Sequence, residues 1–224
     1  MTAWTWLNST AGLLLRIGIG VAIFAALALS DLRRHGKNAT RWREYTFLIL
    51  FVCFALIYGV INDQITSTIS WEFYYYGKDL KNELGPQTPP DSLRLHLAAA
   101  VVGMKATWTV GLLIGAVLLM SNNPSKTLPR LRNRTMLGQL PLLFLFTAAM
   151  ACIGAIAGYF ALLTFCDHNF PEMLHRNEMR PRRFMMAYGI HLGGYIGGAI
   201  AMVIAVCRIR LQRRRKIELS TIEA

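Results

Sequence analysis

"LAAAVVGMKATWTVGLLIGAVLLM", residues 97–120, is the stretch that decides the fold of this chain. It holds one charged residue, Lys105, and as an α-helix it would be about 36 Å long, enough to cross a hydrocarbon core of about 30 Å. Similar apolar blocks lie at residues 10–30, 45–62, 140–164 and 188–209. A backbone in lipid must satisfy its own hydrogen bonds, so each block is expected to be a helix. We therefore predict an all-α membrane protein, a bundle of five transmembrane helices that forms a single integral membrane domain over residues 1–224.

The composition supports a membrane protein. Apolar residues make up 54% of the chain, which is more than a soluble domain normally carries, and they are gathered into the five blocks. A soluble all-helical protein with a very apolar core is the alternative. Five such runs are more than a soluble bundle requires, so the membrane interpretation is favoured.

The distribution of Lys and Arg predicts the orientation. The three segments at residues 31–44, 121–139 and 208–224 hold 15 of the 24 basic residues, and they alternate correctly to lie on one side of a five-span chain. Because basic flanks are retained on the cytoplasmic side, we predict an inner or plasma membrane protein with its N-terminus outside, its C-terminus in the cytoplasm and a basic cytoplasmic tail at 210–224. The net charge of +12 then reflects topology and attraction to anionic lipid, so the bilayer is the expected partner and nucleic acid is not.

The predicted outer loop, residues 63–96, begins with an unusual pattern. From Ile65 to Tyr75 the side chains alternate, with β-branched and aromatic residues at the odd positions. Strict alternation favours an extended segment with one apolar face, which we expect to form an extended or hairpin-like cap over the outer helix ends. Ile65, Ile69 and Phe73 also fit one face of a helix, and the sequence leaves that alternative open.

Glycines recur at helical spacing in three of the spans. The sequence "GLLIG" places Gly111 and Gly115 one turn apart, "GAIAG" does the same at residues 154–158, and "GIHLGGYIGG" forms a stripe along residues 189–197. Such stripes let helix backbones approach closely in lipid. We expect them to pack the third, fourth and fifth spans against one another; contact with a second copy or with partners in a membrane complex is the alternative.

Three stretches carry a resemblance: "YGVINDQITSTISWEFYYYGK", "GMKATWTVGLLIG" and "FMMAYGIHLGGYIGG". They resemble an uncharacterised family of bacterial multi-spanning membrane proteins, which carry an Asp-Gln pair after a span, a Glu-Tyr-Phe-like element, an Ala-Thr-Trp in the next span and a His before a final Gly-rich span. The matching residues in this chain are Asp63, Gln64, Glu72, Phe73, Tyr74, Ala106, Thr107, Trp108, His191 and Tyr195. Where the family tends to have His, this chain has Asn62 and Lys78. The resemblance implies a multi-span topology and nominates residues, but it names no reaction.

Two candidate sites follow from the polar residues. A polar pocket that opens outward is predicted at Asp63, Gln64, Glu72, Lys105, Trp108, His191 and Tyr195, because a lysine inside a span normally lines a cavity or pairs with an acid. His and carboxylate side chains are also ligands for zinc and similar divalent metals. The candidate metal ligands are Glu72, His96, His168, His175 and His191. A haem held by His96 and His191 is a weaker variant, because both lie near helix ends.

Three functions are compatible with these residues. An outward-facing pocket would bind a small solute, an ion or a lipid group. A membrane-embedded metalloenzyme would act at the outer face. A structural or assembly subunit would use the glycine-rich faces and none of the polar chemistry. The sequence does not decide whether the protein is an enzyme, and it contains no phosphate-binding loop, dinucleotide fingerprint or serine-hydrolase motif.

The orientation can be tested with two reporters. A green fluorescent protein fused after Ala224 should fluoresce and an alkaline phosphatase fused there should be inactive, because the six basic residues from Arg208 onward hold this end in the cytoplasm. The same phosphatase inserted after Gly85 should be active. An active phosphatase after Ala224 would contradict the predicted orientation.

Overall fold

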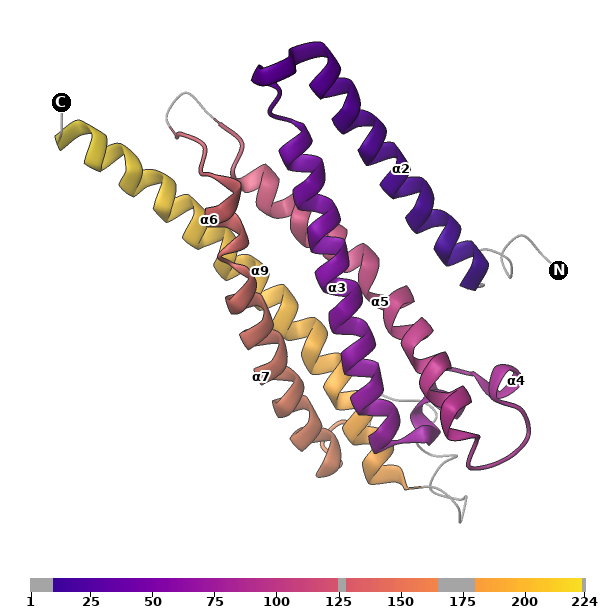
Figure 1. Cartoon of the computed structure of the whole chain (residues 1–224). Helices are drawn as coiled ribbons and strands as arrows, with labels where there is room; N and C mark the ends of the chain where they lie inside the picture. The colour runs from indigo at the N-terminus through magenta and orange to yellow at the C-terminus, as the bar shows by residue number, and fades with distance from the viewer. Residues whose placement is uncertain (1–9, 125–127, 165–179, 223–224) are drawn as a thin grey trace.

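A computed structural model describes residues 10–124, 128–164 and 180–222, with side chains as far as residue 217 (Figure 1). Five long helices, each long and apolar enough to cross a membrane, confirm the predicted all-α, five-helix architecture. They are α2 (Thr10–His35), α3 (Trp42–Ile69), α5 (Ser92–Ser121), α7 (Leu140–Tyr159) and α9 (Pro181–Ile222). The shorter elements are η1 (Gly36–Asn38), η2 (Phe73–Gly77), α4 (Lys81–Leu84) and α6 (Asn133–Leu137). These described ranges contain no strand.

The long helices form two tightly packed pairs, α3 with α5 and α7 with α9, while α2 diverges from the rest toward its N-terminal end (Figure 1). We call the end of the bundle with η2 and α4 the aromatic end, and the end with η1 and α6 the basic end. The α7–α9 pair is held by direct backbone contact. A Cβ added at Gly154 would fall on the carbonyl oxygen of Gly189, and one added at Gly193 would fall on that of Met150. No residue larger than glycine fits at these crossings.

The α3–α5 pair uses glycines in the same way. A Cβ at Gly59 or at Gly103 would collide with the backbone of the other, and one at Gly111 would lie 2.6 Å from the carbonyl oxygen of Phe51. The predicted close packing of the glycine stripes is therefore found within one chain. The partner of the third span is the second span, whereas the sequence predicted the fourth and fifth. A second copy could use these same faces only by breaking the internal pairs.

Side chains at the basic end tie the loops to the helices. Asp31, at the end of α2, accepts hydrogen bonds from the backbone N–H groups of Arg41 and Trp42, at 2.8 and 3.1 Å, and so orients the start of α3. Arg213 of α9 is only 4% exposed. Its guanidinium donates to four backbone carbonyl groups: Ser121, Asn123, Leu128 and Pro129. The basic tail predicted at 210–224 thus continues α9 as far as Ile222 and closes this end of the bundle.

The extended segment predicted from Ile65 to Tyr75 is wrong. Helix α3 continues to Ile69, and Phe73–Gly77 form one π-helical turn. The hydroxyls of Thr66, Ser67 and Thr68 donate back to carbonyl oxygens of the preceding turn, at 2.9–3.0 Å. A helix therefore satisfies both the backbone and these hydroxyls locally, whereas a lone strand would have no partner.

The glycine contacts predict a sharp difference between two substitutions. Gly189→Leu should destabilise the protein by about 3 kcal/mol, because overpacking of this size forces two backbones apart. Gly20→Leu, on α2, is the matched control, since nothing lies within 4 Å of an added Cβ there. Melting temperatures in detergent, read by size-exclusion chromatography of heated samples, should fall for the first variant only. Equal melting temperatures would contradict the role assigned to the contact.

Candidate functional site

The site centres on Asp63, which lies on α3 and is only 2% exposed. Gly103 of α5 makes room for it, because a Cβ at Gly103 would lie 3.1 Å from the carboxyl carbon. Asp63 Oδ1 accepts a hydrogen bond from the Asn62 amide at 3.3 Å. Oδ2 is buried and has no hydrogen-bond partner among the described residues. A buried polar atom without a partner costs about 1–3 kcal/mol, more for a charged group, so this oxygen is poised to accept a hydrogen bond.

His191 faces Asp63 from α9. Its Nε2 lies 3.7 Å from Asp63 Oδ1, longer than a hydrogen bond, and 3.2 Å from the Thr66 hydroxyl. The imidazole stacks on the Phe73 ring, with centroids 4.9 Å apart and planes at 19°. The Lys78 ammonium lies 5.1 Å from the centroid of Phe73. The ring of His191 is thus held by η2 on one side while its Nε2 points toward the hydroxyl and carboxylate of α3.

Tyr74 completes the hydrogen-bond network beneath this pair. Its hydroxyl lies 2.6 Å from the Thr66 hydroxyl and donates to the Asp63 carbonyl oxygen at 3.1 Å. The side chain is 0% exposed. Burial, with the nearby Asp63 carboxylate, raises the pKa of the Tyr74 phenol above its ordinary value. This tyrosine therefore stays protonated, and its hydrogen bonds to Thr66 and Asp63 hold η2 against the end of α3.

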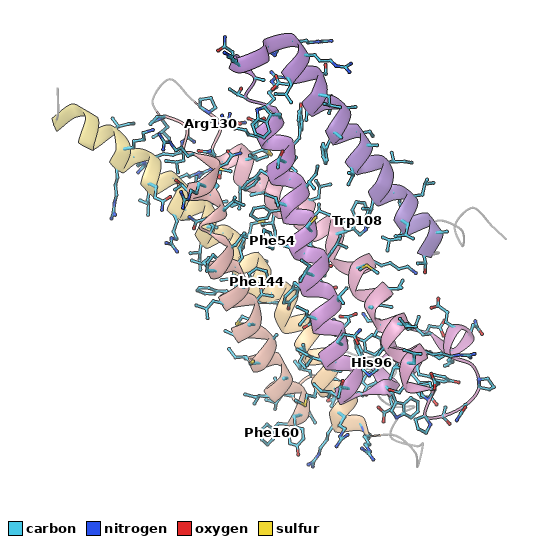
Figure 2. The ribbon with its side chains drawn as sticks, in the orientation of Figure 1. Phe54, His96, Trp108, Arg130, Phe144 and Phe160 are labelled. Atoms are coloured by element: carbon cyan, nitrogen blue, oxygen red, sulfur yellow. The ribbon has the colours of Figure 1, made fainter. Side chains whose placement is uncertain are left out.

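A cavity of about 290 Å³ opens from Asp63 into the space between the two helix pairs. Its lining changes along the bundle axis. The polar groups lie toward the aromatic end: Tyr58, Asn62, Asp63, Thr107, His191 and Tyr195. The other end is apolar. Phe54 of α3 and Phe144 of α7 lie there (Figure 2), and their rings meet edge to face with centroids 6.5 Å apart. The cavity is therefore amphipathic. The Asp63 carboxylate lies at its end near η2, and the apolar rings of Phe54 and Phe144 lie farther toward the basic end of the bundle.

The predicted pocket residues divide into separate groups. Asp63, His191 and Tyr195 line this cavity. Gln64 instead turns to α5, where its Oε1 lies 2.9 Å from His96 Nδ1. Glu72 accepts a hydrogen bond from the Ser70 hydroxyl at 2.6 Å and one from the Arg180 backbone N–H at 3.3 Å.

Lys105 and Trp108 lie on α5 but do not line the cavity, although their neighbours Ala106 and Thr107 do. Both side chains are half-buried. Lys105 has no hydrogen bond or ion pair with any residue in the described ranges, so the predicted pairing with Asp63 or Glu72 is not seen there.

The candidate metal ligands are also dispersed. His191 lies beside Asp63, whereas His96 and Glu72 line a different cavity. His168 and His175 lie outside the described residues. Within the described part of the chain, no group of three or more His, Cys, Asp or Glu side chains could hold a metal ion.

Three residues of the site were not named as candidates from the sequence: Tyr58, Asn62 and Thr66. Thr107 was named only through the family resemblance. Tyr58, Asn62 and Thr66 are spaced by four along the chain, so they share one face of α3, close to Asp63. That helical spacing was the available signal, but the alternating pattern from residue 65 onward obscured it.

Comparison of the chain with family models, with curated proteins and with solved structures found no match.

The raised pKa of Tyr74 predicts an alkaline loss of stability. Above about pH 10 the unfolded chain releases the phenolic proton while the folded chain keeps it, so stability falls as the pH rises. Tyr74→Phe removes this contribution, and its melting temperature should fall less steeply between pH 9 and pH 11 than that of the wild type. Thr66→Val is the control, because it removes the shared hydrogen bond but keeps the phenol and hence the steep slope. Parallel curves for wild type and Tyr74→Phe would refute the assignment.

Proposed function

We propose that this multi-pass membrane protein binds a small amphipathic molecule in the cavity between its two helix pairs. The apolar body of the ligand lies among the aromatic side chains, and a hydrogen-bond donor, such as an amine or a hydroxyl, binds the carboxylate of Asp63. The observation that carries this proposal is the buried Oδ2 of Asp63, which lacks a partner among the described residues although its side chain lines the cavity.

The size and lining of the cavity support a small ligand. A volume of about 290 Å³ lies at the lower end of the range for ligand pockets, which are mostly apolar with a few well-placed polar groups. Tyr58 and Tyr195 add hydroxyls near the carboxylate. Gly194 makes room for the first, since a Cβ there would lie 3.0 Å from the Tyr58 hydroxyl.

The residues that carry the family resemblance support the same position. Asp63, Ala106, Thr107, His191 and Tyr195 come from three different helices and all line this one cavity. With the orientation predicted from the basic residues, the protein lies in the inner or plasma membrane with its N-terminus outside, and the polar end of the cavity faces outward. A ligand would then enter from the outer side or from the outer leaflet.

The proposal can be tested by photolabelling in lipid nanodiscs. The probes are a diazirine-bearing long-chain alkylamine and the methyl ether of the corresponding alcohol, which has the same tail but no donor. The amine should crosslink to peptides that contain Phe54 or Phe144. Asp63→Asn should weaken its labelling about tenfold, the worth of a charge-assisted hydrogen bond, and leave the ether unaffected.

Two further variants distinguish the cavity from general effects. Glu83→Gln removes an exposed carboxylate on α4 at the same end of the bundle, and it should label like the wild type. Phe144→Trp fills the apolar end without touching Asp63, and it should reduce labelling. If the amine labelled wild type and Asp63→Asn equally, the proposed role of the carboxylate would be wrong.

A further inference from the structure

A second cavity, of about 270 Å³, lies at the aromatic end, and its described lining shares no residue with the cavity at Asp63. It is formed where α3 ends and where α5 and α9 begin. The residues that give it chemical character are Trp71, Glu72, Ser92, His96, Arg180 and Arg183. Because these positions are at the ends of helices that are long and apolar enough to span a membrane, the cavity would lie at the depth of lipid headgroups in a bilayer.

The charges that line this cavity do not cancel. The guanidinium groups of Arg180 and Arg183 form no hydrogen bond or ion pair with other residues in the described ranges. Among the described residues, Glu72 is the one acid in the lining, and it is 1% exposed and already bonded to Ser70 and to the Arg180 backbone. Two arginines and one carboxylate give the described part of the lining a formal charge of one positive unit.

The hydrogen bonds of His96 fix its tautomer. The Gln64 amide Nε2 donates to the His96 carbonyl oxygen at 2.9 Å, so its Oε1 must accept from His96 Nδ1. The Nδ1 is therefore protonated, and Nε2 remains with no partner among the described residues. In neutral His96 this nitrogen accepts a hydrogen bond, for example from a headgroup hydroxyl.

We propose that this cavity binds the phosphodiester of a lipid headgroup. A phosphodiester carries one negative charge, which is complementary to the formal charge of the described lining, and an arginine side chain often binds a phosphate through two parallel N–H···O hydrogen bonds. Trp71 also lines the cavity, and tryptophan is enriched at the headgroup level of membrane proteins. This site is independent of the cavity at Asp63, because no described residue lines both cavities. Ser67 of α3 and His96 of α5 line the second cavity, whereas Asp63 and His191 line the first.

The chain provides a matched control within one helical turn. Arg182 does not line this cavity; its guanidinium lies 5.9 Å from the centroid of the Tyr159 ring instead. Arg183→Gln and Arg182→Gln thus remove the same charge from the start of α9, but only the first changes the cavity. Arg180→Gln is a second variant in the cavity.

The experiment measures binding to the full chain in detergent by native mass spectrometry. The probes are dihexanoyl phosphatidylglycerol below its critical micelle concentration, dihexanoylglycerol, which lacks the phosphate, and inorganic phosphate. Arg183→Gln and Arg180→Gln should each weaken binding of the phospholipid about tenfold, whereas Arg182→Gln should bind like the wild type.

Three outcomes would overturn the proposal. Equal losses in Arg183→Gln and Arg182→Gln would show that only net charge matters. Binding of dihexanoylglycerol as tight as that of the phospholipid would show that the phosphate is not recognised. Inorganic phosphate bound as tightly as the phospholipid would assign the cavity to a free anion and not to a lipid.

Discussion

Direct contact between glycine backbones is the constraint on which the rest of this structure depends. Helices in lipid gain nothing from hiding apolar surface from one another, so they associate where small residues allow close van der Waals packing. In this chain that occurs along α3 with α5 and along α7 with α9. Between the two pairs, larger side chains such as Phe54 and Phe144 meet, and the pairs do not close completely. The amphipathic cavity is the space that remains.

The same close contact allows α3 to carry polar groups on two faces near its end. Asp63 and Thr66 face α9, where His191 and the buried hydroxyl of Tyr74 meet them. Gln64 and Ser67 face α5, where both approach His96 Nδ1, at 2.9 and 3.0 Å. Because η2 then folds back over the helix end, Phe73 covers His191 and Glu72 reaches the start of α9. One helix thus separates two polar cavities at the aromatic end of the bundle.

The sequence was sufficient to predict the five helices, because long apolar blocks have only one stable backbone conformation in lipid. It also predicted close packing at Gly154 and Gly189, but not that α5 would pair with α3, since Gly59 is isolated and has no repeat to mark it. The alternation from Ile65 to Tyr75 led to the wrong prediction of an extended segment. Hydroxyl side chains can hydrogen-bond to the backbone of their own helix, and an alternating pattern of side chains gives no information about such bonds. Asp63, His191 and Tyr195 were predicted candidates, and they line one cavity. Whether Lys105 also lines it depends on the rotation of α5 about its own axis, which the sequence does not fix.

A structural role does not account for Asp63 in the way that it accounts for the other buried polar groups. Arg213 places its guanidinium on four carbonyl oxygens, Asn122 bonds Leu131 through both its amide nitrogen and its oxygen, and Asp31 accepts from two backbone N–H groups. Among the described residues, two glutamine amide oxygens, in Gln139 and Gln212, also lack a partner, but an amide is neutral and neither residue lines the cavity. A carboxylate oxygen costs more to bury without a partner. A hydrogen-bond donor bound in the cavity would offset that cost, and this is the physical reason for proposing a ligand beside Asp63 and not beside the other buried polar groups.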